Sequence, residues 1–137
     1  MTRLGNGSLL INEELCIGCE CCQAVCRFLY NTPRVRLARQ PDGRMIPYYC
    51  RHCDRPACIR VCPQGAITKE SDGRVRLNSL ACGYCREKPC LLACRHGGLF
   101  CAEADLPVTK CDLCAHRRAE GLPPACAAIC PVGAILT

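Results

Sequence analysis

The stretch that decides the fold runs from residue 50 to residue 67 and reads Cys50-Arg51-His52-Cys53-Asp54-Arg55-Pro56-Ala57-Cys58-Ile59-Arg60-Val61-Cys62-Pro63-Gln64-Gly65-Ala66-Ile67. It opens with C-x-x-C and closes with C-x-x-x-C. Three further groups of cysteines open and close in the same way, and only the middle gap differs, at two, four, four and eleven residues in chain order. The four groups are Cys16, Cys19, Cys22 and Cys26; Cys50, Cys53, Cys58 and Cys62; Cys82, Cys85, Cys90 and Cys94; and Cys111, Cys114, Cys126 and Cys130.

Cysteine is the dominant feature of the composition. It makes up 18 of the 137 residues, or about 13%, which exceeds the roughly 8–10% that marks chains built around disulfides or metal. Aromatic residues are only 4% and there is no Trp. An ordinary apolar core is therefore not expected to carry the fold alone, and a group bound by the cysteines must supply much of the stability.

Disulfides and zinc are the alternatives to a larger metal cluster. Residues 1–8 contain no apolar signal segment, so we expect reduced thiols in a cytoplasmic protein, or in one carried across a membrane by an exported partner. Zinc ribbons separate their paired knuckles by about 15–20 residues, whereas each group here packs four cysteines into 11 to 20 residues. No apolar run approaches the roughly 18 residues that would insert into a membrane.

The spacing itself predicts [4Fe–4S] clusters. A C-x-x-C-x-x-C loop can supply three thiolates to one cube, and in two-cluster ferredoxins the last cysteine of the motif ligates the other cluster. The C-x-x-x-C interval places that last cysteine at helical spacing, pointing away from its own loop. Sixteen cysteines in four groups therefore predict four [4Fe–4S] clusters.

The formal charge of +6 does not require a nucleic-acid partner. Each cluster with its four thiolates carries roughly −2 when oxidised, so four would bring the whole protein to about −2. Basic residues interleaved with aromatics, as single-strand binding requires, are not present. We therefore expect no nucleic-acid binding.

An internal repeat indicates two similar half-units of α+β class. Residues 11–16 match residues 77–82, and residues 62–67 match residues 130–135. We expect residues 9–11 and 134–136 to pair as first and last strands. Asp42-Gly43 and Asp72-Gly73 predict hairpin turns, between residues 35–37 and 45–46 and between residues 66–68 and 75–77. Residues 57–62 and 126–130 are predicted to form single helical turns.

These motifs closely resemble a known family, the four-cluster ferredoxin-like electron-transfer subunits. Residues 50–67 are similar to the family's second motif. Its fourth motif is similar to Lys110-Cys111-Asp112-Leu113-Cys114, followed by Arg117, Gly121, Pro124-Ala125-Cys126 and Cys130-Pro131. The family comprises the iron–sulfur subunits of dimethyl sulfoxide reductase, formate dehydrogenase, hydrogenase-linked and tungsten aldehyde oxidoreductase complexes. The resemblance extends from about residue 8 to residue 137. The sequence departs from the family pattern in few places. Arg replaces Pro after Cys26 and Cys94, and the middle gap of the third group, residues 86–89, has four residues where many relatives have two.

The resemblance implies one domain over residues 1–137, made of two nested bacterial-ferredoxin-like units with short strands, short helices and many loops. The outer unit would span about 8–30 plus 105–137, and the inner unit about 45–100. The implied ligands are a Cys16 set (Cys16, Cys19, Cys22, Cys130), a Cys111 set (Cys26, Cys111, Cys114, Cys126), a Cys50 set (Cys50, Cys53, Cys58, Cys94) and a Cys82 set (Cys62, Cys82, Cys85, Cys90).

Several cysteines, histidines and tyrosines could be taken for functional residues, but we expect them to have other roles. Cys21 and Cys101 are expected to be spare thiols, although Cys21 is an alternative to its neighbour Cys22 as third ligand. His52 is expected to donate a hydrogen bond near a cluster or to pack. The remaining histidines, His96 and His116, are expected at the surface. The four tyrosines, Tyr30, Tyr48, Tyr49 and Tyr84, are expected to shield clusters from water.

No general base, nucleophile or open metal position is visible, so we expect an electron carrier and not an enzyme. The leading hypothesis is the electron-wire subunit of a larger oxidoreductase, whose catalytic subunit is a molybdenum or tungsten pterin enzyme. A further redox subunit or a soluble ferredoxin would be its second partner. A free polyferredoxin carrier is the alternative, and a redox sensor or cluster-stabilised interaction module is a third.

Overall fold

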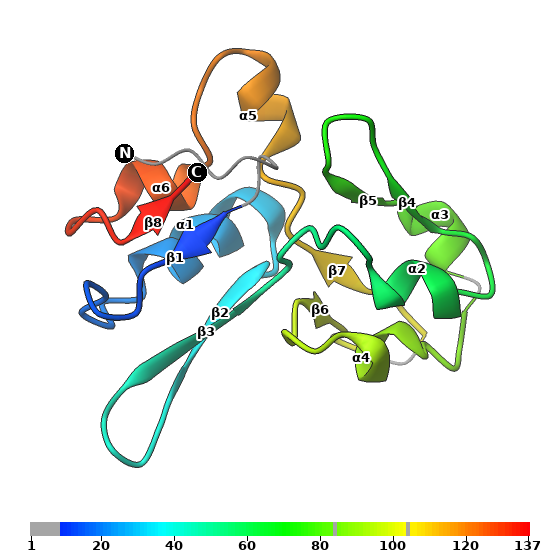
Figure 1. Cartoon of the computed structure of the whole chain (residues 1–137), viewed down its shortest axis with the longest axis horizontal. Coiled ribbons are helices and arrows are strands. Elements are labelled where there is room, and N and C mark those ends of the chain that lie inside the picture. The colour runs from blue at the N-terminus through cyan, green and yellow to red at the C-terminus, as the bar shows by residue number, and fades with distance from the viewer. Residues whose placement is uncertain (1–8, 84, 104) are drawn as a thin grey trace.

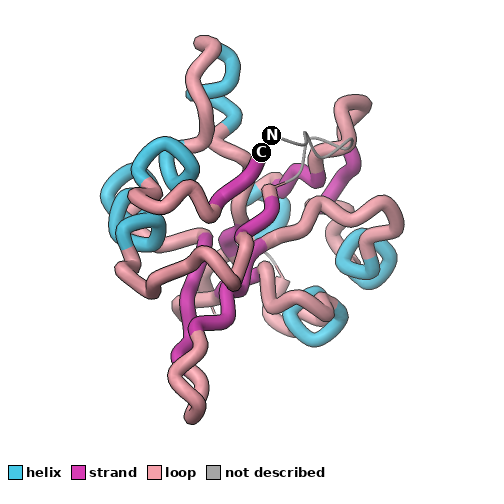
Figure 2. Tube along the Cα trace, turned by 60° about the vertical axis from the view of Figure 1, so that its left-hand side comes forward, coloured by secondary structure: helices cyan, strands magenta, loops and turns pink. Residues whose placement is uncertain are grey.

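The computed structural model describes residues 9–83, 85–103 and 105–137, and its elements are all short (Figure 1). The helices are α1 (Cys21–Tyr30), α2 (Ala57–Val61), α3 (Ser79–Cys82), α4 (Cys90–Ala93), α5 (Ala115–Ala119) and α6 (Ala125–Ile129). The strands are β1 (Leu10–Ile11), β2 (Val35–Arg39), β3 (Met45–Tyr49), β4 (Ile67–Lys69), β5 (Val75–Leu77), β6 (Leu99–Phe100), β7 (Thr109–Lys110) and β8 (Ile135–Leu136). Loops connect them throughout (Figure 2), and the predicted small α+β class is confirmed. The expectations for residues 1–8 and Tyr84 fall outside the described residues.

The two ends of the described chain are held together by β1 and β8. These strands pair antiparallel, with Ile11 opposite Ile135, and the Asn12 N–H donates to the Ala134 carbonyl at 2.7 Å. In Figure 1 they lie side by side beneath α6. The predicted pairing of first and last strands is confirmed.

Two hairpins follow the predicted Asp-Gly turns. Strand β2 pairs with β3, and β4 pairs with β5. In each turn the aspartate Oδ1 accepts the N–H two residues later at 3.0 Å, from Arg44 to Asp42 and from Arg74 to Asp72. The following glycines have φ of +90° and +91°, a conformation that glycine adopts without strain. Both hairpins are therefore specified locally.

Helices α3 and α5 and strands β6 and β7 were not predicted, and helix α1 is longer than the predicted single turn. Helix α1 runs for ten residues, because the C-x-x-x-C turn that ends the first group continues beyond Cys26 to Tyr30. Strands β6 and β7 pair antiparallel across an eight-residue connection. Neither strand is longer than two residues, so the sequence carries no periodic signal for them.

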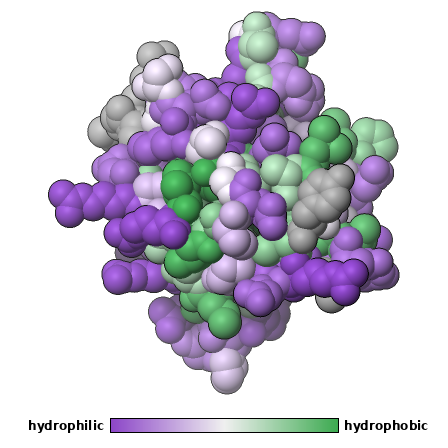
Figure 3. Space-filling model, turned by 90° about the vertical axis from the view of Figure 1, so that its right-hand side faces the viewer, coloured by the Kyte–Doolittle hydropathy of each residue, from purple (hydrophilic) through white to green (hydrophobic). Residues whose placement is uncertain are grey.

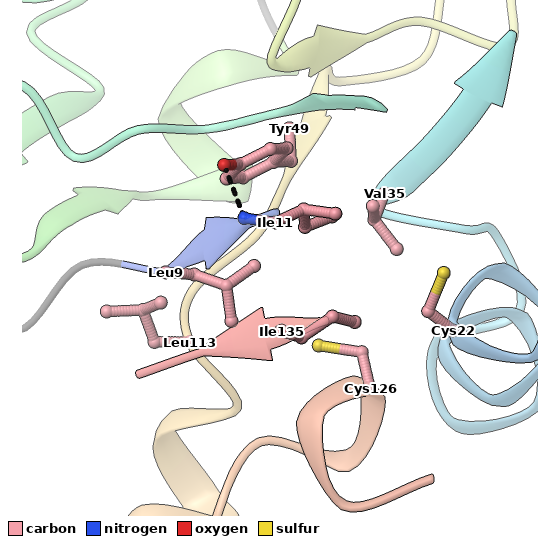
Figure 4. Packing of buried hydrophobic residues seen from close by; sticks show 8 residues of the cluster. All are labelled: Leu9, Ile11, Cys22, Val35, Tyr49, Leu113, Cys126 and Ile135. Atoms are coloured by element: carbon pink, nitrogen blue, oxygen red, sulfur yellow. Dashed lines mark hydrogen bonds between the residues drawn. The ribbon is translucent and has the colours of Figure 1, made fainter. Parts of the chain in front are cut away.

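The buried residues form two separate cores. The first gathers Leu9, Ile11, Cys22, Val35, Tyr49, Leu113, Cys126 and Ile135 (Figure 4). Within it the Tyr49 hydroxyl accepts the Ile11 N–H at 3.0 Å and joins β3 to β1. The second gathers Ala66, Ile67, Val75, Cys82, Cys90, Leu99 and Val108. Besides residues near both ends of the chain, the first core contains Val35 and Tyr49, and the second core contains Val108.

Candidate iron–sulfur sites

The last two cysteines of each group lie one helical turn apart, a rise of about 6 Å along the axis. In the outer half, α1 carries Cys22 and Cys26, and α6 carries Cys126 and has Cys130 as its C-cap. The two helices pack against each other. Each of them therefore reaches from one thiol cavity to the next.

The inner half repeats this arrangement. Helix α2 carries Cys58 and has Cys62 as its C-cap, and α4 carries Cys90 and has Cys94 as its C-cap. These helices also pack against each other. The matching pairs are the structural counterpart of the sequence repeat.

The thiols of the Cys16 set line one cavity. Cys16, Cys19, Cys22 and Cys130 face it together with Cys21, Ile17 and Val132. Burial raises the pKa of Cys22 to about 11, and the thiols of Cys16, Cys19 and Cys130 add to the rise. Loop 16–22 therefore lies beside Cys130, which follows α6. Cys21 stands at the same cavity, and its pKa is raised first by its contact with Cys19.

The Cys111 set lines a second cavity. Its wall contains Cys26 from α1 and Cys111, Cys114 and Cys126 from the C-terminal part of the chain. Burial raises the pKa of Cys126, and repulsion from Cys111, Cys114, Cys22 and Cys26 acts in the same direction. Tyr30 closes one side of this cavity. The pKa of its hydroxyl is raised by burial and then by its hydrogen bond with Cys114, so it covers the thiols as expected.

The Cys50 set lines a wider cavity of about 460 Å³. Cys50, Cys53 and Cys58 come from the deciding stretch, and Cys94 comes from the end of α4. Gly98 allows this approach: a Cβ there would lie 2.6 Å from both the N and the Cα of Cys50. The repeat has Ala66 and Ala134 at the matching positions, where a Cβ is accommodated.

The Cys82 set is the most deeply buried. Cys82, Cys85 and Cys90 are each less than 9% exposed, and Cys62 packs against the same core. Burial raises the pKa of Cys90 to about 11, followed by repulsion from Cys82, Cys62, Cys58 and Cys85. All four predicted members are thus close together, with Cys58 of the Cys50 set beside them.

Backbone donors surround the sulfur atoms. In the described part of the chain, eight N–H groups donate to cysteine Sγ at 3.1 to 3.4 Å, and the acceptors are Cys26, Cys50, Cys62, Cys82, Cys85, Cys94, Cys111 and Cys130. A thiolate accepts much more strongly than a thiol. The donors therefore favour deprotonated sulfur, so the residues fit a group held by thiolates. Cys101 differs, because its Sγ donates to the Glu103 carbonyl at 2.9 Å.

Three of the four last cysteines share one local geometry, whereas Cys26 accepts the Arg34 N–H. Cys62, Cys94 and Cys130 each accept the N–H four residues later, from Ala66, Gly98 and Ala134. The residue before each donor is a glycine with φ near +60°. Only a residue tolerant of the left-handed region turns the chain back onto the sulfur. This is the physical reason for the x-Gly-Ala-Ile part of the motif.

His52 is fully buried and its Nδ1 accepts the Val75 N–H at 2.9 Å. Burial lowers its pKa to about 3, and the positive charge of Lys110 adds to this, so the ring is neutral. It links the deciding stretch to β5. His96 and His116 are exposed, as expected.

Comparison with known proteins agrees with this picture. A family model described as a 4Fe-4S dicluster domain matches residues 41–137. One polypeptide of the anaerobic dimethyl sulfoxide reductase of Escherichia coli (strain K12) is 35% identical, over 91% of this chain and 69% of its own length. The thiosulfate reductase electron transfer subunit of Salmonella typhi is 29% identical, over 98% of this chain and 77% of its own length. One polypeptide of the tetrathionate reductase of Salmonella typhimurium is 31% identical, over 93% of this chain and 55% of its own length.

The fold and the thiol sets define an iron–sulfur protein of the ferredoxin-like class. The chain belongs to the 4Fe–4S dicluster family, which confirms the resemblance found in the motifs. Its cofactors are [4Fe–4S] clusters. Within the described residues no helix is long and apolar enough to cross a membrane.

Proposed function

We propose that the chain conducts electrons through four [4Fe–4S] clusters, one in each thiol set, as the electron-transfer subunit of a larger reductase. The observation that carries the proposal is that described contacts connect each thiol set to another one. The relatives named as parts of dimethyl sulfoxide, thiosulfate and tetrathionate reductases support a catalytic partner of that kind. A molybdenum or tungsten pterin subunit is the partner that the family resemblance implies.

The order of the sets rests on three contacts. Cys22 of the Cys16 set and Cys126 of the Cys111 set lie in one core (Figure 4). Lys110 adjoins Cys111 in the chain and lines the cavity of the Cys50 set. Cys58 packs on the core that contains the Cys82 set. The line therefore runs from the Cys16 set through the Cys111 and Cys50 sets to the Cys82 set.

The two ends of this line carry exposed apolar side chains. At the Cys16 set, Ile17 is 64% exposed. At the Cys82 set, Leu80 and Leu92 are 85% and 95% exposed, and on the face drawn in Figure 3 apolar side chains lie among hydrophilic ones. Contiguous exposed apolar patches mark interaction surfaces, and we infer that these side chains belong to such surfaces. A wire needs one docking surface at each end, for the catalytic subunit and for a second redox subunit or soluble ferredoxin.

The clusters would supply the one-electron redox chemistry. The protein's own residues hold the thiolates, exclude water and compensate negative charge. Backbone N–H groups stabilise the sulfur, and the second core buries most of the Cys82 set. With all four thiols of a set occupied, the chain offers no open metal position for a substrate, and the catalytic step belongs to the partner.

We place the protein in the cytoplasm, with transfer to the other side of the membrane only together with an exported partner. The support is chemical, because free thiols persist and receive clusters in a reducing compartment. Sixteen free thiols in four sets are compatible with that environment.

Metal analysis of the anaerobically purified chain tests the function. Four clusters correspond to about sixteen iron atoms per chain, and a redox titration followed by EPR should resolve four one-electron steps. About eight iron atoms, or clusters that no reductant reaches, would contradict the wire. Size-exclusion of the native complex separates a subunit from a free polyferredoxin carrier, which would migrate alone.

A further inference from the structure

Each lysine of this chain donates a hydrogen bond to the backbone carbonyl of a cysteine in one of the thiol sets. The sequence has only three, Lys69, Lys88 and Lys110. The Nζ of Lys69 donates to the Cys53 carbonyl at 2.8 Å. That of Lys88 donates to the Cys85 carbonyl at 2.7 Å, and that of Lys110 donates to the Cys111 carbonyl at 2.7 Å.

The three acceptors belong to three different thiol sets, the Cys50, Cys82 and Cys111 sets. The Cys16 set has no lysine, and Glu20 lines its cavity instead. The other basic side chains of the protein are arginines. In each of these three sets a cysteine carbonyl thus accepts from a lysine ammonium group, and among the described contacts none does in the fourth set.

Two of these lysines are buried, which is costly for an ammonium group. Lys110 is 3% exposed and Lys88 is 5% exposed. In the part of the chain that the structure describes, neither Lys69 nor Lys110 forms an ion pair with a carboxylate. The counter-charge available to Lys110 is the thiolate-bound group of the cavity that it lines.

We propose that the three lysines set the reduction potentials of the clusters in the Cys50, Cys82 and Cys111 sets, by stabilising the reduced state. This rests on the proposed function and its thiol sets. A four-thiolate cluster goes from roughly −2 to −3 when it gains an electron. A fixed positive charge nearby lowers the energy of the more negative state more strongly, and a low dielectric enlarges the effect. Each lysine therefore raises the potential of its cluster.

Position makes the three effects different. Lys110 lies between the Cys111 set and the cavity of the Cys50 set, so it acts on two clusters. Lys88 is buried at the Cys82 set and acts on that one. Lys69 is exposed, so its effect on the Cys50 set is smaller because water screens its charge. The Cys16 set serves as an internal reference.

The experiment is a redox titration of the whole purified complex, followed by EPR, for Lys69→Gln, Lys88→Gln and Lys110→Gln. Glutamine keeps an N–H donor but removes the charge. We expect Lys110→Gln to lower two midpoint potentials, Lys88→Gln to lower one, and Lys69→Gln to lower one by a smaller amount. The signal of the Cys16 set, identified by its loss in Cys19→Ala, should not move.

The matched control is Arg44→Gln, which removes the same charge from a side chain that is 73% exposed at the β2–β3 turn. It should leave all four potentials unchanged. Lys110→Arg restores the charge and should return both potentials towards the original values. If Lys110 had only a structural role, the midpoint potentials would not depend on the charge at position 110 in this way.

Unchanged potentials in Gln variants that retain full iron would overturn the proposal, as would an equal shift of all four clusters. If Lys110→Gln loses iron, Lys69→Gln at its exposed position still decides the matter. An iron content of about eight in the unmodified protein would instead refute the proposed four-cluster function, so the two failures are distinguishable.

Discussion

At the residue scale, Cys26, Cys94 and Cys130 each line a cavity that the three preceding cysteines of their group do not line. Cys26 follows the loop of the Cys16 set in sequence but lines the cavity of Cys111, Cys114 and Cys126. The helical turn places it there, because four residues advance the chain about 6 Å along the helix axis. We therefore expect the loss of a single thiol to affect a cluster whose other ligands are remote from it in sequence.

Replacement of Cys62 tests this exchange. Cys62→Ala should remove the cluster of the Cys82 set and leave the cluster of the Cys50 set, so that iron falls from about sixteen to about twelve atoms per chain. The missing EPR signal should be the one lost in Cys90→Ala and not the one lost in Cys58→Ala. If the missing signal is instead the one lost in Cys58→Ala, the sets are wrongly assigned. Cys101→Ala, outside all four groups, is the control and should retain all the iron.

At the element scale, close backbone contact decides where two segments can meet. The segment that leads into β6 passes so near Cys50 that only glycine fits at position 98. Lys110 ends β7, the partner of β6, and faces the same cavity. This small sheet therefore joins the Cys50 set to the Cys111 set.

A methyl group at this contact should be poorly tolerated. Gly98→Ala should destabilise the protein by about 1–3 kcal/mol, the range for overpacked cores, and the cluster of the Cys50 set should be lost first. Visible absorbance during titration with denaturant measures the effect. Gly83→Ala is the control, because a Cβ there meets its nearest neighbours at 3.6 Å and should change little. Equal behaviour of the two variants would contradict the packing argument.

The sequence predicted those parts of the fold that local chemistry specifies. Asp42 and Asp72 mark both hairpins because their side chains cap the turns themselves. The cysteine spacing predicted which residue types meet around a cavity. It could not predict β6 and β7, nor the position of Lys110 between two cavities, because these depend on contacts between segments far apart in the chain. The family resemblance, not the spacing, supplied the grouping of individual thiols.

At the scale of the whole molecule, we expect a defect in one core to unfold its own half of the chain and to leave the other half folded. Ile135 and Ile67 occupy equivalent positions of the repeat, and each is at most 6% exposed, in the outer and inner cores respectively. A buried unpaired carboxylate is costly enough to disrupt either core. The two-unit division proposed from the sequence can be tested at these positions.

Ile135→Asp should lose the clusters of the Cys16 and Cys111 sets and retain the inner two, leaving about eight iron atoms per chain. Ile67→Asp should do the opposite. Iron analysis with EPR of the remaining signals distinguishes the two variants. Loss of all four clusters in both would mean that the chain behaves as one cooperative unit.

The β1–β8 closure also affects how the protein matures. Cys16, Cys19 and Cys22 are synthesised early, but Cys130 comes seven residues before the last residue of the sequence. With the proposed sets, the inner two sites have all their ligands once residue 94 has been made, whereas the Cys16 site waits for residue 130. Cluster insertion during synthesis would therefore proceed from the middle of the chain outwards, and the end joined by β1 and β8 would be completed last.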